Sequence, residues 1–152
     1  MRIFLTLFVA ISIWSVSNAK KPNIVIIFTD DQGYADLGCY GSETNKTPRL
    51  DQLAKEGTMF TSFYTQAVCG PSRSALLTGR YPCRSKGWGM PAGEITFAEL
   101  VKGAGYQTAC IGKWDVSNRK PIIDRMPNAQ GFDYFFGALG ANDPGTIKFH
   151  LN

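Results

Sequence analysis

The sequence predicts an α/β protein in which helices sandwich a mainly parallel sheet. An apolar, β-branched run at residues 23–28 is typical of a strand buried on both faces of such a sheet. Beyond it, strand-like and helix-like segments alternate along the chain, which is the pattern of parallel strands joined by helices. With 44% hydrophobic and 18% charged residues, the 152-residue chain has the composition of a globular protein.

End signals predict two helices. Residues 47–57 begin with Thr-Pro, carry leucines on one face and end with a glycine. Residues 96–105 begin with a capping box of Thr96 and Glu99, in which each side chain bonds the other residue's backbone N–H, and also end with a glycine. Residues 58–68, rich in Phe, Tyr and Thr, and residues 106–111 are predicted to be strands.

A third helix is predicted at the Cys-Gly-Pro-Ser-Arg segment, residues 69–73. Pro71 suits the start of a helix, where its missing N–H costs nothing, and Gly79 is placed to end the helix. Cys69 and Arg73 are four residues apart, so a helix projects them from the same side. Free N–H groups at a helix start also attract anions. The segment therefore predicts a nucleophile facing an anionic ester, although a cysteine taken alone is more often a small buried hydrophobe.

Charged residues follow two of the predicted strands. Asp30 and Asp31 come directly after residues 23–28, and Lys113 follows residues 106–111. Open α/β sheets bind ligands beyond the carboxyl ends of their strands. Two adjacent carboxylates repel each other unless a cation or donors intervene, and a hard cation, calcium in preference to magnesium, satisfies both. A solvated turn is the alternative for an isolated Asp-Asp pair.

The amino-terminal segment predicts export. Residues 1–19 have a basic start, an apolar stretch and small residues before Lys20, as in a secretory signal peptide. The stretch is short for a membrane span, so we expect no stable membrane anchor. The mature chain would be periplasmic or extracellular in a bacterium, and in the secretory pathway or lysosome in a eukaryote. The net charge of +4 is dispersed, which gives no indication of nucleic-acid binding.

Several of these segments together resemble the type I, formylglycine-dependent sulfatases of the alkaline phosphatase superfamily. The family signature, Cys-x-Pro-Ser-Arg followed by Gly-Arg, is matched at every fixed position within residues 69–80. Segments at 22–38, 47–57, 112–114 and 131–137 resemble further family motifs in the same order. The resemblance covers roughly residues 22–140. It implies that residues 20–152, which follow the predicted signal peptide at 1–19, are the incomplete, N-terminal portion of a sulfatase catalytic domain.

The resemblance implies hydrolysis of a sulfate ester, on a sulfated small molecule or a sulfated glycan, to alcohol and sulfate. Cys69 would be oxidised to Cα-formylglycine by a formylglycine-generating enzyme. One hydroxyl of the hydrated aldehyde would attack sulfur, and the other would then expel sulfate. Asp30 and Asp31 would hold calcium together with residue 69. Arg73 and Lys113 would offset the negative charge of the hydrate and the sulfate.

The chain departs from the family pattern in two respects. The family has histidine after Gly-Lys-Trp, where this chain has Asp115. That aspartate adds negative charge beside an anionic ester and is expected to oppose its binding. Family members also run to several hundred residues and carry later metal and sulfate ligands, whereas this sequence has 152 residues.

Alternatives stay open at this point. The chain fits a truncated, catalytically inactive sulfatase-like protein, and a phosphatase or phosphodiesterase of the same superfamily shares the paired aspartates. A cysteine hydrolase that pairs Cys69 with the sole histidine, His150, is a third interpretation. Among the remaining cysteines, Cys39, Cys83 and Cys110, one disulfide is allowed, with a pairing that the sequence does not determine.

Overall fold

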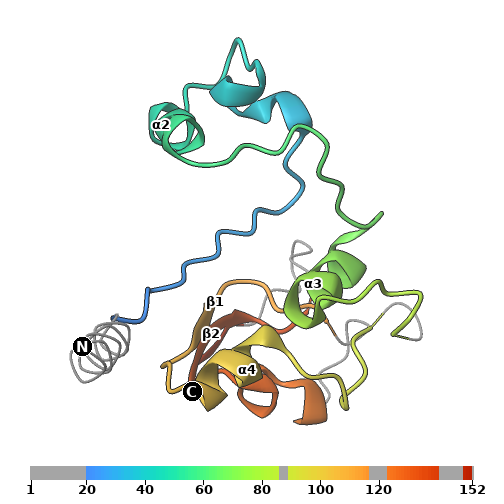
Figure 1. Ribbon diagram of the computed structural model, residues 1–152. Helices are drawn as coiled ribbons and strands as arrows, with labels where there is room; N and C mark the ends of the chain where they lie inside the picture. Colours follow the sequence, from blue (N-terminus) through green and yellow to red (C-terminus); the bar gives the residue numbers. More distant parts are fainter. Residues whose placement is uncertain (1–19, 86–88, 117–122, 141–148, 152) are drawn as a thin grey trace, which may run out of the picture. The chain divides into compact units, whose positions relative to one another are not determined.

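The computed structural model describes residues 20–85, 89–116, 123–140 and 149–151 (Figure 1). The predicted signal peptide, residues 1–19, lies outside them. The chain divides into two units, Met1–Asp30 and Asp31–Asn152, which are described separately below. No helix among the described residues is long and apolar enough to cross a membrane.

In the first unit, the predicted strand at residues 23–28 does not form. Residues 20–29 have no helix or strand, and the side chains of Val25 and Ile27 are 82% and 74% exposed. A strand exists only through pairing with a neighbour, whatever its own composition. The sheet that the described residues build contains strands from the second unit alone, so the prediction of a buried strand is wrong for this structure.

The second unit begins with short helical segments. The 3₁₀ helices η1 (Tyr34–Asp36) and η2 (Gly38–Tyr40) precede the α-helix α2 (Pro48–Glu56). As predicted, α2 starts after Thr47 and ends at Gly57. The Asp51 carboxylate ties α2 to η2, because it accepts hydrogen bonds of 2.8 Å from the Cys39 backbone N–H and the Thr47 hydroxyl.

The predicted strand at residues 58–68 is also absent. This segment is irregular, and the side chains of Phe63 and Tyr64 are 76% and 85% exposed. Its aromatic and β-branched residues suit a pleated surface, but the described residues offer no strand that pairs with it. The segment leads directly into the next helix.

Helices α3 (Cys69–Thr78) and α4 (Phe97–Gly103) agree closely with prediction. Gly79 ends α3 in the left-handed conformation, at φ 66°, which glycine adopts without steric cost. At the start of α4, Thr96 Oγ1 accepts from Glu99 N–H, and the Glu99 carboxylate accepts from Thr96 N–H, which is the predicted capping box.

A small mixed sheet has the order β1-β2-β3. Strand β1 (Ala109–Ile111) runs parallel to β2 (Tyr134–Ala138), with Ala109 opposite Tyr134. Strand β3 (Phe149–Leu151) pairs with β2 in the antiparallel direction. Strand β1 confirms part of the strand predicted at 106–111. We expected a buried strand here, but Ile111 is 74% exposed at the open edge of the sheet.

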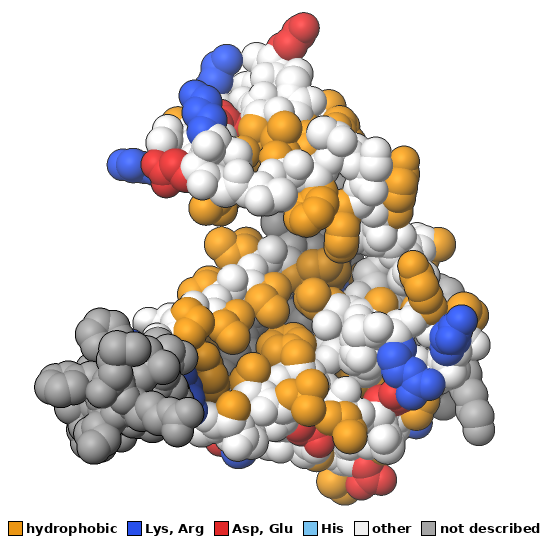
Figure 2. All heavy atoms as spheres, viewed as in Figure 1, with side chains coloured by type: hydrophobic (Ala, Val, Ile, Leu, Met, Phe, Trp, Pro, Cys, Tyr) orange, Lys and Arg blue, Asp and Glu red, His pale blue; other side chains and the backbone are white. Residues whose placement is uncertain are grey.

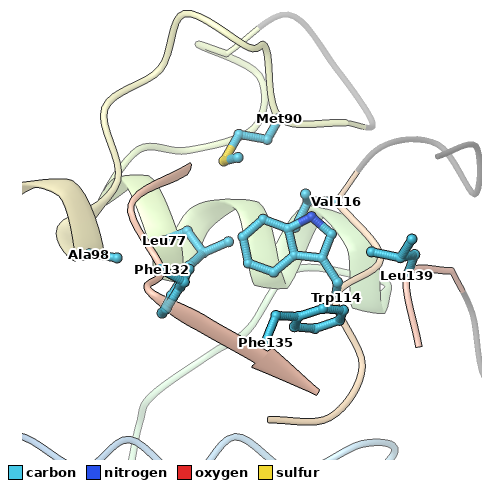
Figure 3. Packing of buried hydrophobic residues seen from close by; sticks show 8 residues of the cluster. All are labelled: Leu77, Met90, Ala98, Trp114, Val116, Phe132, Phe135 and Leu139. Carbon is cyan, nitrogen blue, oxygen red and sulfur yellow. The ribbon is translucent and has the colours of Figure 1, made fainter. Parts of the chain in front are cut away.

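The hydrophobic core lies between α3, α4 and β2 (Figure 3). Trp114 and Phe132 meet edge to face, with ring centroids 5.7 Å apart, and Phe97 and Phe132 meet in the same way at 6.1 Å. The 3₁₀ helices η3 (Ile123–Arg125) and η4 (Pro127–Gln130) lead into this core. Its buried members are Leu77, Met90, Ala98, Trp114, Val116, Phe132, Phe135 and Leu139.

The four cysteines are free thiols. The disulfide that the sequence allowed among Cys39, Cys83 and Cys110 is therefore not formed. Burial rather than cross-linking holds the second unit together.

Candidate active site

The first residue of α3 and the loop after β1 form a polar cluster beside the core. Half-buried Cys69 opens α3, and its thiol donates a hydrogen bond of 3.2 Å to Asp115 Oδ2. One turn later, Arg73 Nη1 donates to the Lys113 carbonyl oxygen at 2.7 Å. Both side chains therefore project toward the same loop, as their four-residue spacing predicted.

The loop at residues 112–116 is fixed along the end of β2 by its own backbone. The N–H groups of Gly112 and Trp114 donate to Phe136 and Ala138 carbonyls at 2.8 Å, and Asp115 N–H donates to Leu139 at 3.1 Å. Gly112 turns the chain out of β1 with a φ of 110°, a region that favours glycine. This loop is therefore an ordered platform for the site.

Side chains alternate along the loop. Trp114 points into the core, where its indole N–H donates to the Arg125 carbonyl at 2.6 Å. Lys113 and Asp115, which flank Trp114 in the sequence, have their side chains next to each other. Lys113 Nζ lies 3.7 Å from Asp115 Oδ2, and the two side chains are only 7% and 5% exposed.

The negative charge of Asp115 is compensated within this cluster. A buried carboxylate is costly unless it is paired and hydrogen-bonded, and Asp115 has both an ion pair and a donor. The positive charge of Arg73 also acts on the neighbouring strand. Burial raises the pKa of the Cys110 thiol to about 11, although the Arg73 guanidinium works in the opposite direction.

The structure brings three of the predicted site residues together: Cys69, Arg73 and Lys113 all meet at this loop. Of the predicted metal ligands, Asp30 is the last residue of the first unit and Asp31 is the first residue of the second. Both are exposed, and Asp31 has a left-handed φ of 50°. The described residues contain no group of three or more His, Cys, Asp or Glu side chains able to hold a metal.

Asp115 is the residue whose role sequence reasoning missed. It was expected to oppose an anion, yet it bonds Cys69 and pairs with Lys113. The available signal was its position two residues after Lys113, a side chain of opposite charge, with a tryptophan between them. His150 lies in β3, opposite Gly137, while the Cys69 thiol donates its hydrogen bond to Asp115.

Comparison with known proteins identifies the family of the chain. The Sulfatase family model matches residues 22–147. Human arylsulfatase A is 46% identical over 141 residues, which cover 86% of this chain and 28% of that protein. The chain belongs to the sulfatase family.

Solved structures agree in fold. The structure of Ps i-CgsB in complex with k-i-k-neocarrahexaose superposes with a TM-score of 0.71 at 39% identity, over 80% of this chain and 29% of that one. The structure of BT4656 in complex with its substrate, D-glucosamine-2-N,6-O-disulfate, gives a TM-score of 0.68 at 31% identity, over 88% and 28%. The neighbours establish an alkaline phosphatase-like α/β fold, of which this chain covers a part.

Proposed function

We propose that this chain carries the nucleophile-bearing part of a sulfatase that hydrolyses a sulfate ester to an alcohol and sulfate. The chain spans about 28% of the length of human arylsulfatase A, so the activity belongs to a full-length protein. The observation that carries the proposal is the meeting of Cys69, within the complete family signature, with Arg73 and Lys113 at one buried loop.

Residue 69 suits conversion to Cα-formylglycine. Its side chain stands at the start of α3 and faces a carboxylate at 3.2 Å, where a hydroxyl would find an acceptor. When present, the hydrated aldehyde supplies the hydroxyl that attacks sulfur and the one that expels sulfate. The chain's own contribution is the positive charge of Arg73 and Lys113, which offsets the charge on the sulfate.

We also propose that the site holds a calcium ion, for which this chain offers only part of the ligands. Asp30, Asp31 and residue 69 offer oxygen ligands once residue 69 is converted, but calcium takes about six to eight. The described residues gather no group of three candidate ligands. These residues would hold the ion only together with further oxygens, and we derive no step through it.

The substrate is proposed to be a sulfated sugar or glycan, or a small aryl sulfate. BT4656 is bound to a disulfated glucosamine, and the human relative is an arylsulfatase. The two further proposals from the sequence are export of the chain and a partner enzyme that generates formylglycine. Residues 1–19, which carry the export signal, lie outside the described residues.

The test begins with residue 69. The chain is co-expressed with a formylglycine-generating enzyme and exported, and the peptide containing residues 69–73 is analysed by mass spectrometry. We expect loss of the mass difference between a CH₂SH side chain and an aldehyde. Cys69→Ala is the negative control, and a known sulfatase in the same cells is the positive one. An unmodified thiol beside a converted control contradicts the proposal.

The reaction is tested in a full-length context, with the chain joined to the remaining part of a sulfatase relative. We expect hydrolysis of an aryl sulfate that depends on Cys69. Hydrolysis of an aryl phosphate in preference to the sulfate would favour the phosphatase alternative. Conversion of residue 69 without any turnover would favour an inactive sulfatase-like protein.

A further inference from the structure

We infer that Asp115 is a positioning residue for the side chain at position 69. Its carboxylate, itself held by Lys113, accepts a hydrogen bond from residue 69 and fixes the direction in which that side chain points. The inference rests on the proposed function, because it assigns a role within that same site. It replaces the expectation that an aspartate at this place merely repels the substrate.

A single carboxylate oxygen of Asp115 contacts both neighbouring side chains. Asp115 Oδ2 lies 3.2 Å from Cys69 Sγ and 3.7 Å from Lys113 Nζ, so it links the two side chains. A thiol is a weak donor, whereas a hydroxyl donates strongly to a carboxylate. The acceptor is thus better matched to a hydroxyl at position 69 than to the encoded thiol, which agrees with conversion of that residue.

The backbone holds the carboxylate in place. Asp115 has a φ of 43°, a left-handed conformation that is uncommon outside glycine and that aspartate tolerates better than most residues. Its N–H donates a hydrogen bond to the Leu139 carbonyl. Two residues earlier, the carbonyl of Lys113 accepts a hydrogen bond from Arg73. Such conformations persist where surrounding contacts enforce them, and they cluster at functional sites.

The ion pair also changes the charge that an anion meets. An unpaired aspartate would repel a sulfate ester, because like charges a few ångström apart interact strongly where the effective dielectric constant is lower than that of water. Here the Lys113 ammonium lies next to the same carboxylate oxygen and offsets its charge. Asp115 can therefore orient residue 69 without giving the site a net negative charge.

The S–H stretching band of Cys69 tests the contact in the full 152-residue chain, without any modification. Raman spectra of the wild type and of Cys69→Ser assign the band. We expect Asp115→Ala to move it to higher frequency, because the thiol loses its acceptor, and Asp115→Asn to retain most of the original position, because the amide oxygen still accepts. Asp124→Ala removes an exposed carboxylate elsewhere and should leave the band unmoved.

A Cys69 band that stays in place in Asp115→Ala overturns the inference. Since that variant leaves Lys113 buried without its carboxylate, it could fail to fold. The double variant Lys113→Met/Asp115→Ala removes both charges and is expected to show the same upward shift. An unshifted band in the folded double variant overturns the inference equally.

Kinetics in the full-length context then separate positioning from substrate repulsion. We expect Asp115→Ala to lower kcat by on the order of 10- to 100-fold with little change in KM, because the reacting group is misplaced. Asp115→Asn should restore a large part of kcat. Asp115→His should also lower kcat, and a rise would overturn the inference. If the wild type hydrolyses no sulfate ester while the Raman shift is observed, the proposed function fails and the contact stands.

Discussion

Cys110 shows how burial sets the chemistry of a single residue next to the site. Its thiol is half-buried on β1, and desolvation raises its pKa to about 11 despite the nearby Arg73. An ordinary cysteine has a pKa near 8.5, and only the thiolate reacts with alkylating agents. The neutral thiol is therefore favoured in the folded chain, and this contribution to stability is lost only as the pH rises toward about 11.

We predict that at pH 8 Cys110 is alkylated by iodoacetamide on the order of 100 times more slowly than an ordinary thiol, as the difference in pKa requires. Exposed Cys83 is the comparison within the same molecule, and peptide mass spectrometry reads both sites. In guanidinium chloride the two rates should converge. Equal rates in the folded chain would contradict the burial of Cys110.

Arg73 and Lys113 carry the second prediction at this scale. In a full-length context, alanine at either position should lower kcat/KM for an aryl sulfate by on the order of 100-fold, because a charge that stabilises the developing anion is lost. Arg49→Ala removes an exposed cation on α2 and serves as the control. Unchanged activity in Arg73→Ala or Lys113→Ala would assign that residue a structural role alone.

Among the elements, strand β2 and the site loop approach each other unusually closely. A Cβ added to Gly137 would lie 1.8 Å from the Gly112 carbonyl oxygen, which belongs to the backbone and cannot move aside alone. The strand can therefore run beside the loop that carries Lys113 and Asp115 only because residue 137 lacks a side chain.

We predict that Gly137→Ala destabilises the second unit by about 1–3 kcal/mol or more, the range for overpacking a tight contact. Gly140→Ala is the matched control, since a Cβ there meets nothing within 4 Å. Chemical denaturation of the two variants measures the difference. Similar unfolding free energies for both would show that the loop and the strand separate without cost.

The elements also show what could be predicted from the sequence. Helices α2, α3 and α4 were predicted with their ends, because caps, prolines and glycines act within a few residues of one another. The strands predicted at residues 23–28 and 58–68 do not form, since a strand depends on a partner distant in sequence. In the site, helical spacing placed Cys69 and Arg73 together. The contact of Asp115 with Cys69 spans 46 residues and left no local signal.

The whole molecule exposes much apolar surface. Figure 2 shows hydrophobic side chains gathered on the visible face. Among the exposed residues are Phe60, Phe63, Tyr64, Ile111 and Leu151, with exposures between 65% and 85%. Extended apolar patches on soluble proteins mark surfaces that contact other protein segments. In relatives such as arylsulfatase A, this chain corresponds to 28% of the length.

We predict that the 152-residue polypeptide by itself binds the dye ANS strongly. Joined to the remaining part of a sulfatase relative, the same residues should bind much less dye and unfold at a higher temperature. The substitutions Phe63→Ser and Tyr64→Ser should reduce the ANS fluorescence of the isolated polypeptide and have less effect in the joined protein. Weak ANS binding by the isolated polypeptide would mean that these side chains find cover of their own.

The packing of α3 also determines whether Cys69 can be modified before or after folding. Gly70, Pro71 and Ser72, which directly follow the cysteine, are buried in the folded chain. An enzyme that must bind these residues in order to oxidise Cys69 cannot reach them while they are packed in the folded chain. Under the proposed function, we therefore predict that Cys69 is converted before α3 folds, and that a molecule that folds first keeps its thiol. A formylglycine-generating enzyme should convert Cys69 in vitro in a peptide spanning residues 65–80 but not in the folded chain. Folding of α3 would then end the period in which Cys69 can be oxidised.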